Sequence, residues 1–90
     1  MSNKGTGDRF EVVIKVLDDL MSRGELRCIG CGKELHGRIE FYRHSGGVED
    51  ENGQRWWIYI TCNSCGYQNS WWKLLRQFVN RKRREAGLGE

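Results

Sequence analysis

Two copies of the motif Cys-x-x-Cys-Gly constrain this 90-residue chain more than any other feature. The first copy, CIGCG, begins at Cys28, the second, CNSCG, begins at Cys62, and together they contain all four cysteines of the chain. Zinc in structural sites binds four ligands in a tetrahedron, and thiolates suit it. The pattern therefore predicts one structural Zn²⁺ held by Cys28, Cys31, Cys62 and Cys65.

A glycine follows the second cysteine of each motif, as Gly32 and Gly66. Glycine adopts a positive φ without a Cβ clash, so each turn can direct backbone N–H groups toward its sulfurs and offset their charge. A redox dithiol is the alternative interpretation, but that activity is typical of a single motif in a βαβ context. Four thiolates also leave no open coordination position for a catalytic water.

The length predicts a single domain, residues 1–90, that depends on a metal for part of its stability. Within it we expect a flexible leader over 1–7, a helix over 9–23, a zinc-binding region over 26–69 and a basic helix over 71–86. The polar start, MSNKGTGDR, does not resemble a signal peptide. No apolar run is long enough to span a membrane. We therefore expect an intracellular, cytoplasmic protein with no membrane partner.

The first helix is predicted from apolar residues at three- and four-residue spacing, which fall on one face. Asp8 and Glu11 form a possible capping box, and Gly24 is a natural stop. The apolar positions are Phe10, Val13, Ile14, Leu17, Leu20 and Met21.

Between the cysteine motifs the apolar period changes to two, which predicts two strands. In a strand over 36–44, HGRIEFYRH, Ile39 and Phe41 would point to one side. In a strand over 55–61, RWWIYIT, Trp56 and Trp57 would point to opposite sides. Residues 45–54, SGGVEDENGQ, are predicted to form the hairpin loop. One tryptophan should pack beneath a helix. The other, with Tyr42 and Tyr59, should form an aromatic surface. Such a surface can stack bases or dock a partner, and coverage by the N-terminal helix is the favoured interpretation.

The last helix is predicted to begin at Ser70 as its cap and to end at Gly87. Its apolar stripe comprises Trp71, Leu75, Phe78 and Val79, flanked by Trp72 and Leu74. Lys82 interrupts this stripe, so the helix should leave the protein body after Asn80.

Residues 28–69 resemble the four-cysteine zinc ribbons of archaeal and eukaryotic transcription factors and small RNA polymerase subunits. The resemblance implies an α+β fold: a small zinc ribbon with a β-hairpin or three-stranded antiparallel sheet, here flanked by an N-terminal and a C-terminal helix. Transcript-cleavage factors of this type have an acidic pair in the hairpin loop. The acids Glu49, Asp50 and Glu51 lie farther from Cys62 than that pair does, which favours a simple loop tip.

Rubredoxins, which hold one iron in four cysteines, resemble the chain in the gap between the motifs and in the C-x-x-C-G turns. The chain has no proline, whereas rubredoxins typically carry one in the second turn, and they are acidic throughout. Zinc is favoured, and a rubredoxin-like electron carrier remains the less favoured alternative.

Charge is segregated along the chain. Residues 71–86 contain six basic side chains and one acidic one, whereas residues 1–70 contain nine basic and ten acidic. Arginines on a rigid helix can pair with phosphates in a fixed register, and amide side chains can contact base edges. The predicted nucleic-acid contacts are Lys73, Arg76, Gln77, Asn80, Arg81, Arg83 and Arg84.

These patterns favour a nucleic-acid-binding protein, with DNA preferred over RNA, that has a regulatory or accessory role in transcription. The alternative is a protein-interaction adaptor, for example on RNA polymerase, that uses the aromatic sheet or the apolar fringe of Val12 and Val16. We expect no enzymatic activity, because the sequence contains no nucleophile–base set and no phosphate-binding loop.

Overall fold

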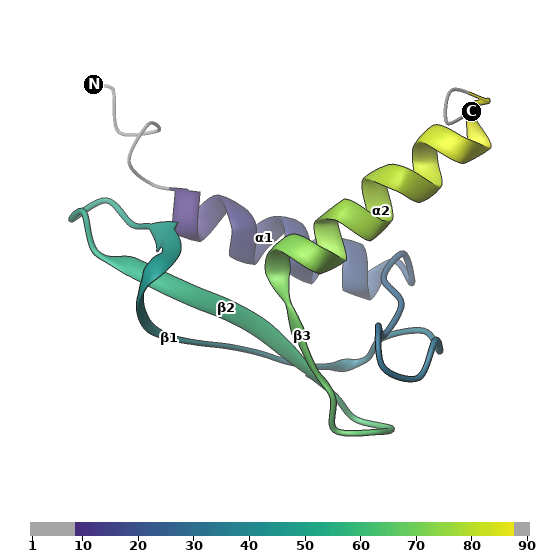
Figure 1. Cartoon of the computed structure of the whole chain (residues 1–90), viewed down its shortest axis with the longest axis horizontal. Helices are drawn as coiled ribbons and strands as arrows, with labels where there is room; N and C mark the ends of the chain where they lie inside the picture. The colour runs from purple at the N-terminus through teal and green to yellow at the C-terminus, as the bar shows by residue number, and fades with distance from the viewer. Residues whose placement is uncertain (1–8, 88–90) are drawn as a thin grey trace.

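The computed structural model describes residues 9–87, which form two helices and a three-stranded antiparallel sheet (Figure 1). The strand order is β1-β2-β3. This confirms the predicted α+β class, with a helix before and a helix after the strands; the leader 1–7 and Asp8 lie outside the described residues. The elements are α1 (Arg9–Ser22), β1 (Gly37–Glu49), β2 (Arg55–Cys62), β3 (Gln68–Ser70) and α2 (Trp71–Glu85).

Both helices pack on the same face of the sheet (Figure 1). From α1, Leu17 and Leu20 are buried against Ile58 and Ile60 of β2, which confirms the predicted apolar stripe of this helix. Gly24, with φ of 72°, follows the end of α1 as expected. Neither helix in the described part of the chain has the length and apolar composition that crossing a bilayer requires.

Strand register separates the two tryptophans of β2 as predicted. Trp56 packs beneath α1, with its ring centroid 5.7 Å from that of Phe10. Trp57 pairs with Tyr42 across the strands and lies on the opposite face, where Tyr42 is 48% exposed. The expectation that α1 covers this aromatic surface is therefore wrong, because α1 packs only on the face that Trp56 shares.

The hairpin differs from the prediction of a loop over 45–54. Strand β1 continues to Glu49, and a bulge between Arg43 and Val48 absorbs the extra residues. Only the turn around Asp50 separates β1 from β2. The Asp50 carboxylate accepts hydrogen bonds from the backbone N–H groups of Asn52 and Gln54 and from the Trp56 indole, 2.9 Å away. The indole bond is the main reason that the pKa of Asp50 is lowered, so this acid organises the turn.

Replacing Gly47 in the bulge with alanine should destabilise the protein by about 2–3 kcal/mol. A Cβ at this position would lie 2.1 Å from the backbone oxygen of Trp56, so the paired strands would have to separate. Gly46→Ala is the matched control, since its Cβ would meet side chains and no backbone: the His44 ring at 3.2 Å and the Trp57 ring at 4.0 Å. Urea unfolding of the two variants measures the difference, and equal stabilities would contradict the prediction.

Helix α2 presents most of the predicted stripe to the core, since Trp71, Leu75 and Phe78 pack against it, but the buried face is displaced toward Leu74. Leu74, expected at the flank, is fully buried, whereas Val79 is 49% exposed. Gln77, expected on the polar side, is half-buried. Ser70 occupies the N-cap position as predicted, but its side chain makes no capping hydrogen bond. Gly87, with φ of 77°, follows the helix end as predicted.

The second half of α2 stays attached beyond Asn80, contrary to the prediction. The Arg81 guanidinium donates a hydrogen bond to the Glu25 backbone oxygen at 2.5 Å and lies 3.2 Å from the Glu25 carboxylate. Lys82 Nζ lies 3.4 Å from the same carboxylate. Desolvation opposes ionisation of Glu25, but these two cations outweigh it and lower its pKa. The segment after α1 therefore holds α2 by ion pairs that the apolar pattern did not reveal.

Candidate metal centre and basic groove

The two Cys-x-x-Cys-Gly turns adopt the same backbone structure, and we call them the first knuckle (residues 26–35) and the second knuckle (residues 62–67). In the first, the Cys28 N–H donates to Lys33 O at 2.8 Å and the Gly32 N–H donates to Cys28 O at 2.8 Å. In the second, Cys62 and Gly66 donate to the equivalent carbonyls at 3.0 and 2.9 Å. Gly32 and Gly66 have φ of 77° and 79°, which confirms why glycine occupies both positions.

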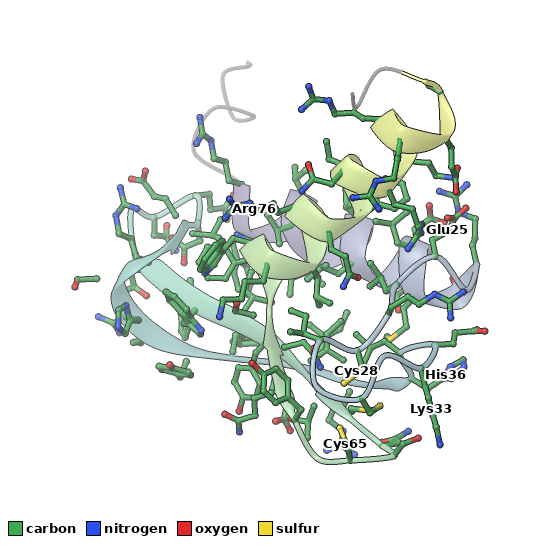
Figure 2. All side chains as sticks on the ribbon, turned by 45° about the vertical axis from the view of Figure 1, so that its right-hand side comes forward. Glu25, Cys28, Lys33, His36, Cys65 and Arg76 are labelled. Carbon is green, nitrogen blue, oxygen red and sulfur yellow. The ribbon has the colours of Figure 1, made fainter. Side chains whose placement is uncertain are left out.

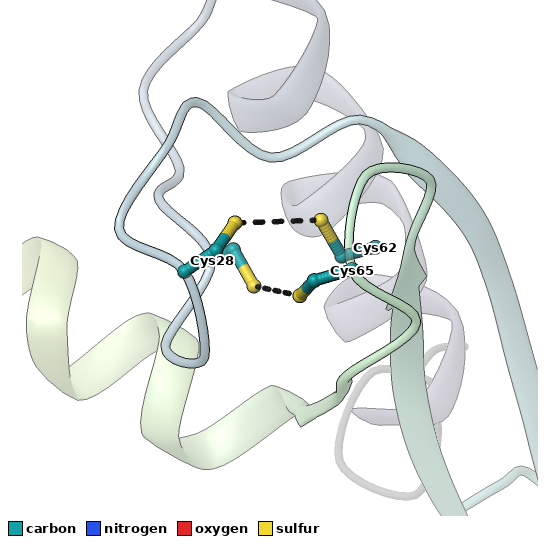
Figure 3. A group of neighbouring side chains, drawn as sticks. Cys28, Cys62 and Cys65 are labelled. Carbon is teal, nitrogen blue, oxygen red and sulfur yellow. Dashed lines mark hydrogen bonds between the residues drawn. The ribbon is translucent and has the colours of Figure 1, made fainter.

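The sulfurs of the two knuckles face one another (Figure 3). Cys28 Sγ lies 3.6 Å from Cys65 Sγ, and Cys31 Sγ lies 3.9 Å from Cys62 Sγ. All four sulfurs lie within 4.8 Å of one another. Ligands about 2.3 Å from a tetrahedral zinc ion are separated from each other by about 3.8 Å. The predicted ligand set is therefore brought together with the spacing that a metal ion requires.

The protonation of these sulfurs also suits a cation. Burial opposes ionisation of Cys28, but backbone N–H groups and Asn69 outweigh it and lower the pKa to about 6. The backbone N–H of Cys65 is the main reason that the pKa of Cys62 is lowered. For Cys65, which is exposed, a bond from the Tyr67 backbone favours the thiolate, but local desolvation and the neighbouring sulfurs outweigh it and raise the pKa to about 12. A bound cation removes this mutual repulsion, so that all four can be thiolates.

Asn69 is a supporting residue that the sequence patterns did not reveal. It lies in β3 and is fully buried. Its Oδ1 accepts a hydrogen bond from the Ile29 N–H at 2.7 Å, and its Nδ2 lies 3.6 Å from Cys28 Sγ. Nδ2 also donates to the backbone oxygens of Ile60 and Tyr67, both at 3.2 Å. One side chain thus ties the first knuckle to β2 and the second knuckle.

The two histidines lie outside the cluster of sulfurs. His36 Nε2 lies 3.2 Å from Glu34 Oε2, and the two side chains are 64% and 49% exposed. His44 Nδ1 accepts a hydrogen bond from the Gly46 N–H within the bulge. Among residues 9–87, the only grouping of candidate metal ligands is the four cysteines.

No family model matches the chain, and the searches of curated proteins and of solved structures likewise find no match. The description of the chain as a ribbon-like module therefore rests on the geometry of its four clustered cysteines. Kinship with transcription-factor ribbons receives no support from these comparisons.

The most distinctive surface around the metal centre is a groove of about 630 Å³ between the first knuckle and α2, which we call the basic groove. The first knuckle contributes Arg27, Cys28, Ile29 and Gly32 to its lining. Six of the seven predicted nucleic-acid residues line the other wall; Arg83 does not. The six are Lys73, Arg76, Gln77, Asn80, Arg81 and Arg84.

The predicted nucleic-acid residues of α2 differ in whether their side chains are paired with a carboxylate. Arg81 is occupied by Glu25, with 27% of its side chain exposed. By contrast, no carboxylate of residues 9–87 pairs with Lys73, Arg76 or Arg84. The same holds for Arg27, which the sequence patterns did not single out because it precedes the knuckle rather than lying on the basic helix.

Proposed function

We propose that this chain is a zinc-ribbon protein that binds nucleic acid, with DNA preferred over RNA, in a regulatory or accessory role in transcription. The observation that carries the proposal is the charge of α2. Its cations Lys73, Arg76, Arg83 and Arg84 have no carboxylate partner among residues 9–87. Unpaired cations held on one rigid helix are suited to successive phosphates.

The metal in this proposal is a single structural Zn²⁺. Four sulfur ligands saturate a tetrahedral ion, which supports a structural rather than a catalytic role and a protein without enzymatic activity. Iron bound by the same four cysteines is the competing assignment. Elemental analysis of purified protein should find one zinc per chain, and a red sample with visible absorption would instead indicate a rubredoxin-like centre.

Binding of a fluorescent DNA duplex, followed by anisotropy over a range of salt concentrations, tests the nucleic-acid assignment. If about four phosphates are neutralised, log K should fall with log salt at a slope near −3.6. Affinity should then decrease about 150-fold between about 50 and 200 mM salt. A labelled RNA of the same sequence, measured in parallel, should bind more weakly.

The variant for this assay changes Lys73, Arg76 and Arg84 to glutamine, which removes the three charges that have no carboxylate partner and line the groove. We expect about a 100-fold loss of affinity and a decrease of about 2.7 in the magnitude of the salt slope. The control changes Lys15 of α1 and Lys33 of the first knuckle to glutamine and should bind as the unmodified protein does. Unchanged binding by the α2 variant would exclude α2 as the contact.

An adaptor role is the second candidate, and the exposure of Val12 and Val16 supports it. These two residues lie one turn apart on α1, and their exposed fractions are 56% and 38%. An apolar pair of this kind can anchor a partner protein. Co-purification of RNA polymerase in the presence of nuclease, lost in Val12→Asp, would favour this role over direct nucleic-acid binding.

A further inference from the structure

We propose that the basic groove holds one phosphodiester strand, contacted from both walls, so that the first knuckle is half of the nucleic-acid interface. This inference rests on the proposed function and adds the location of the strand. It differs from a docking mode in which α2 alone makes the contacts. The chemistry is that of a phosphodiester backbone, supplied either by a single strand or by one strand of a duplex.

Both walls of the groove present cations. Arg27 lies on the knuckle wall, and Lys73, Arg76 and Arg84 lie on the α2 wall. None of these four pairs with a carboxylate among the described residues, and no acidic residue lines the groove. A concave surface lined by one sign of charge concentrates the field on a bound anion.

The metal centre beneath the groove does not cancel this field. Zn²⁺ with four thiolates carries a formal charge of about −2, and Cys28 lies in the groove lining. Four unpaired cations outweigh that charge. Figure 2 shows the arrangement, with Cys28 below α2 and Arg76 on α2. The groove between the first knuckle and α2 therefore keeps a net positive charge.

The length of the α2 wall fits a chain rather than a lone phosphate. Eleven residues separate Lys73 from Arg84, which corresponds to about 16 Å along a helix. The cations on this wall recur at spacings that keep them on one side of α2. A polyanion that runs parallel to α2 can meet them in succession while Arg27 contacts it from the opposite wall.

Gln77 provides an independent indication that the groove recognises more than charge. It lines the groove on the α2 wall, and its Oε1 is buried without a hydrogen-bond partner among the described residues. An unsatisfied buried acceptor costs about 1–3 kcal/mol. Rotation of this amide into the groove would satisfy it with an N–H donor, which the base edges of a nucleotide chain supply and bare phosphate does not.

Single charge removals on and off the groove test the proposal. Arg27→Gln and Arg76→Gln, one on each wall, should each weaken binding of a 20-nucleotide single strand about 5- to 10-fold. Each should also reduce the magnitude of the salt slope by about 0.7 on single strands or about 0.9 on duplex. Lys33→Gln and Arg83→Gln should change affinity less than twofold. Lys33 projects from the same knuckle away from α2 (Figure 2), and Arg83 lies on α2 outside the groove lining.

The single-stranded and duplex forms of the same sequence are measured in parallel, and the form that binds more tightly identifies the source of the strand. Zinc content and melting temperature of each variant establish that the fold is intact, and Arg76→Gln does not alter the metal-binding knuckles.

An Arg27→Gln variant that binds normally, or an Arg83→Gln variant as impaired as Arg76→Gln, would overturn the groove as the binding site while leaving the proposed function standing. Competition by poly-glutamate as effective as by unlabelled oligonucleotide would assign the groove to an acidic protein segment instead. Failure of the unmodified protein to bind any oligonucleotide would overturn the proposed function itself.

Discussion

Removal of the bound metal by a strong chelator should unfold the protein, and Cys62→Ser should unfold it without a chelator. Structural zinc contributes roughly 10–16 kcal/mol in small metal-binding domains, whereas the net stability of a domain is about 5–15 kcal/mol. Within residues 9–87 only ten apolar residues are buried, and two of them are the ligands Cys28 and Cys62. The remaining core is too small to replace the metal.

Circular dichroism during thermal melting, together with elemental analysis, checks this result. Ser64→Ala is the matched control. Only the backbone N–H of Ser64 approaches Cys62 Sγ, at 3.4 Å, so this variant should keep both its metal and its cooperative transition. A metal-free protein that still melted cooperatively at the same temperature would show that the sulfurs do not maintain the fold.

Asn69→Ala should destabilise the protein by about 3–5 kcal/mol, which is the second largest effect that we expect. The substitution leaves the Ile29 N–H and the Ile60 oxygen without their present partner, and each buried unsatisfied group costs about 1–3 kcal/mol. It also removes a donor from Cys28 Sγ. Loss of such a supporting bond typically lowers metal affinity by 10- to 100-fold, so zinc should transfer to a competing chelator more readily.

Asn69→Asp separates the two roles of this side chain. A carboxylate can still accept from the Ile29 N–H, but it cannot donate to Cys28 Sγ and it places a negative charge beside the sulfurs. Metal affinity should therefore fall at least as far as in Asn69→Ala. Gln68→Ala, at the exposed neighbouring position of β3, should change neither property. An Asn69→Ala variant with normal stability and metal affinity would contradict the role assigned here.

The features that were predictable from the sequence are those that depend on local spacing. The four ligands follow from the repeated motif, because a Cys-x-x-Cys-Gly turn forms from five consecutive residues. The face that α1 buries and the separation of Trp56 from Trp57 follow from helical and strand periodicity. Each of these predictions required only neighbours along the chain, and the structure bears each of them out.

The misjudged features depend on contacts between distant segments. The core-facing side of α2 is displaced from the predicted one, since Leu74 is fully buried and Val79 is exposed. The continued attachment of α2 depends on Glu25, which is 56 residues from Arg81. An amphipathic pattern shows that a helix has an apolar side, but the partner surface determines how that side is oriented and where contact ends.

The sequence by itself determined the four-cysteine cluster, the α+β class and the concentration of positive charge at one end of the chain, because local spacing and composition specify all three. Only the tertiary structure decided that Asn69 supports the first knuckle and that Arg27 faces the cations of α2 across a groove. Asn69 is 41 residues from Cys28, and Arg27 lies 46 residues before Lys73. Such juxtapositions arise only when packing brings distant segments together, and no periodicity along the chain encodes them.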